Sequence, residues 1–276
     1  MPWRTWKHYL TYFDGLAEPY DCLRPEYPQV LFKWLSLKVA PWPPSRVVDV
    51  GAGTGFASLP LARLGCPVTA VEQSRDMAGF LRKKARGVNG YEVVHSPFEK
   101  LSPQTSGFDL AMCGTAFHWL APSSRVSRIA RMLKGGGWLC LAWNIFEEDE
   151  TCQAIREALD RCCPSLETER SPAHAPAQNF RDVQVEVSRG GGFRLEGTQE
   201  WVRPRTYVRD DLLPLLLTHT GVRALPKSEI DTLRKHLLNT VGTEIEIVYR
   251  VTAILFRRMG RFPHSGDEVA ENPAGD

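Results

Sequence analysis

Short apolar runs alternate with helical patterns through the middle of the chain. Five runs rich in β-branched and other apolar residues are separated by stretches in which apolar residues recur every three or four positions. The runs predict strands and the intervening stretches predict helices. Strands that read as nearly continuous apolar runs are typical of a parallel sheet covered on both faces. We therefore predict an α/β fold with a doubly wound, mostly parallel sheet. The predicted strands are 47–50, 68–71, 91–94, 108–112 and 138–143.

Changes in composition and in the pattern of apolar residues divide the chain into four segments. Residues 1–45, rich in aromatic residues and proline, predict an N-terminal helical cover segment, and residues 46–146 predict the core. Residues 147–261 predict a helical insertion and the last strands of the sheet, and residues 262–276 predict a tail without order. The other expected elements are helices at 26–38, 149–163, 210–220 and 227–241, a loop at 169–179, and strands at 193–202 and 244–256. Helix is an alternative for 244–256, because periodicity alone does not type a short apolar run.

Composition narrows the class of protein. The chain has 276 residues, 43% of them hydrophobic, and a net charge of +2. These values argue against a disordered chain and give no electrostatic footprint for nucleic acid. No apolar stretch is long enough to span a membrane, and no signal peptide is expected. Seven scattered cysteines are typical of free thiols in a reducing compartment, so we expect a cytoplasmic protein.

A glycine-rich turn follows the first predicted strand. Residues 47–55 read V-V-D-V-G-A-G-T-G, a helical pattern comes next, and Glu72 ends the second strand 21 positions after Gly51. Glycines let a ligand approach the backbone at a helix N-terminus, and a strand-end carboxylate can bind both hydroxyls of a ribose. The dinucleotide fingerprint fails, because Phe56 and Ser58 occupy the two positions where its last glycine would fall. This argues against an NAD-dependent reductase.

These residues resemble a known family. The segment 47–55 and Glu72 are similar to the first motif and the ribose-binding acid of the class I S-adenosylmethionine-dependent methyltransferases. Three further segments resemble small-molecule methyltransferases related to trans-aconitate methyltransferase: R-P-E-Y-P at 24–28, A-F-H-W at 116–119 and the glycines at 135–137. The resemblance covers about residues 10–146. It implies a Rossmann-like fold, S-adenosylmethionine as cofactor and methyl transfer as the activity. The chain departs from the pattern at 95–97 (H-S-P) and at Thr115.

The resemblance implies a set of site residues. The expected cofactor-binding residues are Asp49, Gly51, Ala52, Gly53, Gly55, Glu72, Gln73, Met77, Phe98, Glu99, Cys113 and Thr115. The expected substrate or lid residues are Tyr20, Arg24, Tyr27, Trp119 and Trp143. His118 is the candidate catalytic residue, as a base or as a positioning group, with simple packing as the alternative. No metal-ligand spacing is present, so no metal is expected.

Several alternatives stay open. We expect a small-molecule acceptor methylated on oxygen or nitrogen, carboxylates included, and neither nucleic acid nor membrane as partner. The rival hypothesis is a catalytically silent binding protein with the same fold, because a fold does not determine a function. The basic and aromatic stretch 201–207 (W-V-R-P-R-T-Y) can be a carboxylate-binding surface or, as we favour, a solvated face. The sequence leaves the acceptor and the oligomeric state undetermined.

Overall fold

The elements of the fold come from a computed structural model, which describes residues 13, 15–101, 107–166, 180–190 and 192–260. The expected tail at 262–276 and the expected loop at 169–179 lie outside the described residues. The helices are α1 (Ala17–Leu23), α2 (Gln29–Lys38), α3 (Ser58–Arg63), α4 (Arg75–Lys84), α5 (Arg125–Met132), α6 (Glu150–Cys162), α7 (Phe180–Gly190), α8 (Arg209–Leu217), α9 (Thr220–Arg223) and α10 (Lys227–Thr240), with short 3-10 helices η2 (Phe98–Lys100) and η3 (Phe117–Trp119). The strands are β1 (Val47–Val50), β2 (Val68–Glu72), β3 (Tyr91–His95), β4 (Phe108–Gly114), β5 (Leu133–Phe146), β6 (Phe193–Val208) and β7 (Glu244–Arg258).

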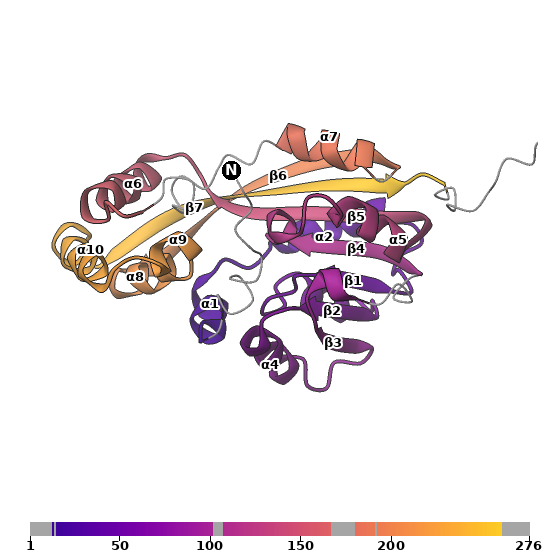
Figure 1. The fold of residues 1–276 in the computed structure, drawn as a ribbon, viewed down its shortest axis with the longest axis horizontal. Helices are drawn as coiled ribbons and strands as arrows, with labels where there is room; N and C mark the ends of the chain where they lie inside the picture. The colour runs from indigo at the N-terminus through magenta and orange to yellow at the C-terminus, as the bar shows by residue number, and fades with distance from the viewer. Residues whose placement is uncertain (1–12, 14, 102–106, 167–179, 191, 261–276) are drawn as a thin grey trace, which may run out of the picture.

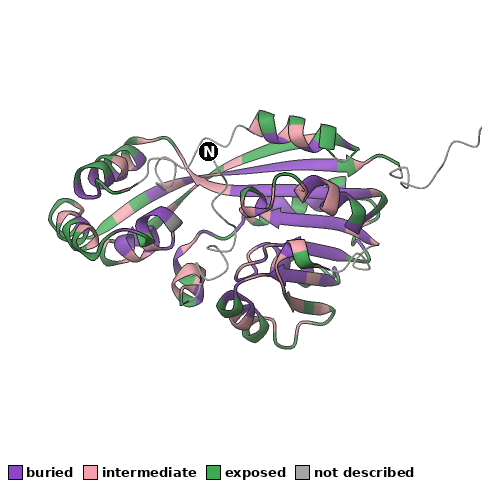
Figure 2. Cartoon of the chain, viewed as in Figure 1, coloured by how far each residue is buried: buried purple, intermediate pink, exposed green. Residues whose placement is uncertain are grey.

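One seven-stranded sheet forms the centre of the molecule, in the order β3-β2-β1-β4-β5-β7-β6 (Figure 1). The first five strands are parallel, and β7 lies antiparallel to both β5 and β6. Apolar side chains of α5 and α7 pack on one face of the sheet, and those of α2 and α3 pack on the other. The core strands are accordingly buried, whereas the helices keep exposed outer faces (Figure 2). The predicted doubly wound, mostly parallel α/β fold is confirmed.

Two strands are longer than their apolar runs. β5 begins at Leu133, which pairs with Phe108 across a register shift, and β6 continues to Val208. Much of β6 is exposed, because it is the edge strand, so a buried-strand pattern captures only part of it. Its Pro204 is tolerated because an edge strand has unpaired N–H positions. The segment 244–256 is a strand, as predicted.

The predicted helices are found with shifted boundaries. α2 starts at Gln29 rather than at residue 26, because Pro28 adopts an extended conformation at its N-cap. The predicted helix 210–220 is two helices, α8 and α9, and α1 has no counterpart among the sequence predictions. Ser74 caps α4 by accepting a hydrogen bond from the Met77 N–H at 3.3 Å, as its residue type indicates.

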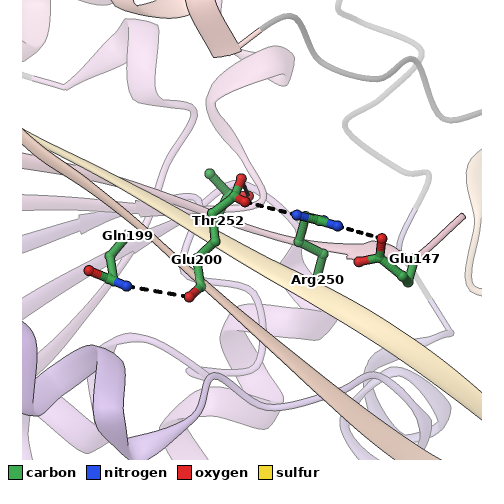
Figure 3. Close-up of polar contacts among 5 residues, drawn as sticks. All are labelled: Glu147, Gln199, Glu200, Arg250 and Thr252. Atoms are coloured by element: carbon green, nitrogen blue, oxygen red, sulfur yellow. Dashed lines mark hydrogen bonds and ion pairs between the residues drawn. The ribbon is translucent and has the colours of Figure 1, made fainter.

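The long strands β5, β7 and β6 continue beyond the parallel core, toward the left of Figure 1. Their extensions and α6, α8, α9 and α10 share a second apolar core, and we call this part the distal module. Arg250 of β7 bonds to β6 and to the residue just after β5, because it donates to Glu200 Oε2 at 2.8 Å and to Glu147 Oε1 at 2.5 Å (Figure 3). Thr252 also donates to Glu200, at 3.1 Å. These bonds tie the strands together beside the crossing into the distal module.

Candidate functional site

The glycine turn joins β1 to α3 and is held by the acid at the end of β2. Glu72 is 6% exposed, and its carboxylate accepts hydrogen bonds from the Gly53 N–H and the Ser74 N–H, both at 2.7 Å. Burial raises the pKa of Glu72, and the two backbone bonds counter the rise. Glu72 therefore braces the turn and also keeps unused acceptor positions toward the cavity described next.

A two-lobed cavity lies at the carboxyl edge of the sheet. Both lobes are lined by Tyr20, Gly51, Gly53, Gly114 and Thr115, so they meet at the glycine turn and at the end of β4. Lobe I is lined in addition by Arg24, Pro25, Tyr27, Asp49, Ala52, Thr54, Phe56, Ala57 and Asn144. Lobe II is lined in addition by Phe13, Val71, Glu72, Gln73, Met77, Ser96, Phe98, Glu99, Ala116, Trp119 and Leu120.

The glycines of the turn differ in their surroundings: one opens into the cavity, and two allow close packing. Gly53 has φ +56°, and a Cβ built on it would meet no atom within 4 Å, so this position opens into the cavity. Gly51 has φ +73°, and its Cβ would come within 2.5 Å of the Ala116 Cβ. Gly55 lines neither lobe: its Cβ would lie 2.5 Å from Leu81 Cδ1. Gly55 thus allows close packing of α3 against α4, and the expected cofactor contact there stays a prediction.

Lobe I holds one unpaired carboxyl and one guanidinium. Asp49 is 1% exposed, and neither of its carboxyl oxygens has a hydrogen-bond partner. Burial raises the pKa of Asp49 to about 7; the neighbouring Ser58 lowers this pKa in part, and the negative charge of Glu72 raises it. Arg24 donates to the Thr218 hydroxyl at 2.7 Å and to the Thr218 carbonyl at 3.2 Å, and no carboxylate pairs with it among the described residues. Lobe I is thus suited to a ligand carrying both a cationic and an anionic group.

Aromatic rings line the cavity where the lobes meet. Phe13 contacts Tyr20 and Trp119 edge-on, with ring centroids 6.1 and 6.2 Å apart. Tyr20 also stacks on Phe56, with ring centroids 6.0 Å apart. These four side chains, Phe13, Tyr20, Phe56 and Trp119, come from four separate segments of the chain, and we call them the aromatic wall.

Tyr27 of the R-P-E-Y-P segment holds the loop after β4. Its hydroxyl shares a hydrogen bond with Thr115 Oγ1 at 2.7 Å and donates to the Ala142 carbonyl at 3.3 Å. Thr115 has φ +51°, a left-handed conformation that is costly for a residue with a branched Cβ. The contact with Tyr27 helps to keep Thr115 in this conformation at the junction of the lobes.

Two expected site residues point into the core instead. Cys113 and Trp143 are fully or almost fully buried in the apolar cluster on the α5 and α7 face, where Trp143 contacts Phe180. Side chains alternate between the faces of a strand, so the next residue along each strand, Gly114 or Asn144, lines the cavity. The predictions of a cofactor contact at Cys113 and a substrate contact at Trp143 are therefore corrected.

His118 lines neither lobe and keeps an exposed edge, but the surrounding protein and the nearby charges of Arg125 and Arg24 lower the pKa of its imidazole to about 4. It belongs to η3, in which three residues make one turn, so Phe117 enters the core and Trp119 lines lobe II, whereas His118 lines neither lobe. Its ring contacts that of Trp119, with centroids 5.0 Å apart. The catalytic or positioning role of His118 stays a prediction.

We expect His118→Ala to change the cofactor dissociation constant and kcat by less than about twofold, as is usual for an exposed side chain outside a binding site. Steady-state kinetics with calorimetry would check this, and a large fall in kcat alone would restore a catalytic role.

Sequence reasoning missed several lining residues. Phe13, Phe56 and Asn144 belong to no motif, although Asn144 directly follows a residue that was singled out. Asn144 donates to the Pro25 carbonyl at 3.0 Å, and its buried Oδ1 has no partner among the described residues.

Within the described ranges, no helix is long and apolar enough to cross a membrane. No group of three or more His, Cys, Asp or Glu residues in those ranges is arranged to hold a metal ion.

Comparisons with known proteins agree with this architecture. The methyltransferase domain family matches residues 48–141. An uncharacterized methyltransferase of Schizosaccharomyces pombe is 27% identical over 84% of this chain and 88% of its own length. One from Mycobacterium tuberculosis is 30% identical over 52% of this chain, and the match spans 56% of that relative.

Solved structures share the fold. The YcgJ protein of Bacillus subtilis has a TM-score of 0.56 and 19% identity, over 84% of this chain and 98% of its own. The [4+2]-cyclase SpnF has a TM-score of 0.60 and 14% identity, over 93% of this chain and 98% of its own. The family match identifies residues 48–141 as a methyltransferase domain, and the methyltransferase relatives and the strand order agree with it.

Proposed function

We propose that the chain binds S-adenosylmethionine across both lobes of the cavity and methylates a small molecule that contacts the aromatic wall. The observation that carries the proposal is the distribution of charge along one cavity. Glu72 lies in lobe II, whereas Asp49 and Arg24, which have no charged partners, lie in lobe I. When bound, the cofactor supplies an activated methyl group on a sulfonium sulfur.

Lobe II suits the nucleoside part of the cofactor. The Glu72 carboxylate is available to the two ribose hydroxyls, and Gly53 presents open backbone beside it. Met77, Phe98 and Leu120 offer buried apolar surface for a flat base, and Glu99 and Gln73 offer polar groups at the rim. The residues present therefore fit the group.

Lobe I suits the amino-acid part of the cofactor. The Asp49 carboxylate would pair with the ammonium group and the Arg24 guanidinium with the carboxylate. Pairing also explains the buried, unpartnered Asp49 oxygens, because an isolated buried carboxylate is costly unless a ligand provides a counter-charge. Asp49, Arg24 and Glu72 thus orient the cofactor, and the lobes exclude water from it.

The acceptor is proposed to have an apolar body and to be methylated on oxygen or nitrogen. Its wall would be Phe13, Tyr20 and Trp119, which are large, apolar and close to the junction of the lobes. A carboxylate acceptor is disfavoured, because Arg24 is the one arginine in the described lining and is assigned to the cofactor. A ubiquinone biosynthesis O-methyltransferase of Xanthomonas oryzae, 35% identical over 137 residues, supports oxygen as the methylated atom.

Calorimetry with S-adenosylhomocysteine tests the cofactor proposal, and methyl transfer to a panel of phenols, amines and carboxylic acids tests the acceptor proposal. We expect binding, and transfer to phenols or apolar amines. Binding without transfer to any compound would favour the catalytically silent alternative, which the cyclase on this fold makes a real rival. No binding by the intact protein would overturn the proposal.

Cofactor affinity should fall as the pH drops below about 7. The pKa of Asp49 in the free protein is about 7, and a bound ammonium would favour the ionised carboxylate and lower this pKa. Protonation therefore competes with binding, so the dissociation constant should rise about tenfold between about pH 7.5 and 5.5. Calorimetry in buffers of different ionisation enthalpy should record proton release at the lower pH. Asp49→Asn should bind weakly at both pH values and lose the trend, and an unchanged trend would remove Asp49 from the site.

A further inference from the structure

The C-terminal end of α1 is held by side chains that lie almost 200 residues away in sequence. Arg205 of β6 donates to the Cys22 carbonyl at 2.6 Å and to the Arg24 carbonyl at 2.7 Å. Tyr207 donates to the Leu23 carbonyl between them, at 2.9 Å. The last carbonyls of a helix have no partners within it, so these three bonds cap α1 from outside.

The Tyr207 hydroxyl is itself fixed. Because it donates to the Leu23 carbonyl, it must accept from the Tyr249 hydroxyl, which lies 2.8 Å away. Both tyrosines are buried in the apolar core of the distal module, and burial raises the pKa of each above its ordinary value. The cap is therefore built from rigid parts of β6 and β7.

The same short helix connects this cap to the cavity and to the core. Tyr20 and Arg24 lie at this end of α1 and line lobe I. On the core side, Asp76 of α4 accepts from the Gly15 N–H at 2.9 Å, and Lys84 pairs with Asp21 at 2.5 Å. The Arg24 guanidinium is held in turn by Thr218, just past α8.

We propose that Arg205 and Tyr207 are positioning residues for the cofactor site: by capping α1 they set where the Arg24 guanidinium and the Tyr20 ring stand in lobe I. The inference rests on the proposed cofactor function. It also gives the basic stretch 201–207 a role other than the two that the sequence left open. Arg205 binds backbone carbonyls of the same chain, so it is neither a carboxylate site nor a simple solvated charge.

The test is a double-mutant cycle on S-adenosylhomocysteine binding, measured by calorimetry. Arg205→Ala should raise the dissociation constant about tenfold, and Tyr207→Phe about threefold, because each loosens the end of α1 that carries Arg24. In an Arg24→Ala background, Arg205→Ala should have a clearly smaller effect, about threefold or less, because only the Tyr20 ring is left for it to position. Arg205→Lys should restore part of the affinity, since one ammonium can reach a carbonyl.

Arg203→Ala is the matched control. Arg203 is on the same strand and carries the same charge, and among the described residues it makes no hydrogen bond or ion pair with α1. We expect this variant to bind like the wild type. Equal binding by Arg205→Ala and wild type, or additive losses in the double mutant, would overturn the inference. A wild-type protein that binds no S-adenosylhomocysteine would instead overturn the proposed function, so the two failures are distinguishable.

Discussion

Gly53→Val is expected to reduce the affinity for S-adenosylhomocysteine by more than about a hundredfold. Gly53 has φ +56°, and its Cβ direction points into open space that both lobes share. A branched side chain there would occupy the volume that the ligand needs beside Glu72, and it would also strain the left-handed backbone. Calorimetry or a thermal-shift titration would measure the loss.

Gly87→Val is the control that separates backbone strain from the filling of the ligand's volume. Gly87 also has positive φ, +78°, with no atom within 4 Å of a built Cβ, but it lies after α4 and lines neither lobe. We expect both variants to lose a similar free energy of unfolding, of order 1–2 kcal/mol for the backbone conformation. Only Gly53→Val should lose binding. Normal binding by Gly53→Val would make the loop a structural turn and would contradict the proposed function.

Glu72→Ala should weaken binding ten- to a hundredfold, because hydrogen bonds to a charged group contribute about 1.5–3 kcal/mol. The structure adds a second expectation. The carboxylate also accepts from the Gly53 and Ser74 N–H groups, so the variant should unfold at a lower temperature as well. Calorimetry and thermal melting would record both changes.

Glu92→Ala provides the comparison, because Glu92 is an exposed carboxylate on the neighbouring strand β3. It should bind and melt like the wild type. If Glu72→Ala melts early but binds normally, its carboxylate braces the turn and has no part in ligand binding.

Local signals account for what sequence reasoning predicted well. β1, β2 and β3 and the turn after β1 are short, contiguous and apolar or glycine-rich. Such features depend on neighbours in sequence, so they can be recognised without the fold. The strand end at Glu72 follows in the same way, because the second apolar run stops there.

Cavity lining was harder to predict, because it depends on which face of a strand or helix turns inward. The side chains that line the cavity lie one position after Cys113, Trp143 and His118, at Gly114, Asn144 and Trp119. A shift of one residue moves a side chain to the other face of a strand, and a motif match does not carry that information when the strand's limits are uncertain.

The sequence by itself determined the parallel core, the glycine turn and the acid at Glu72, because each of these features depends on a few adjacent residues. Only the tertiary structure decided the rest. Phe13, Phe56 and Asn144 meet at one cavity, and Arg205 and Tyr207 cap a helix that precedes them by some 180 residues. Contacts of this kind join distant segments when β6 pairs with β7 at the sheet edge, and no local pattern of residues records them.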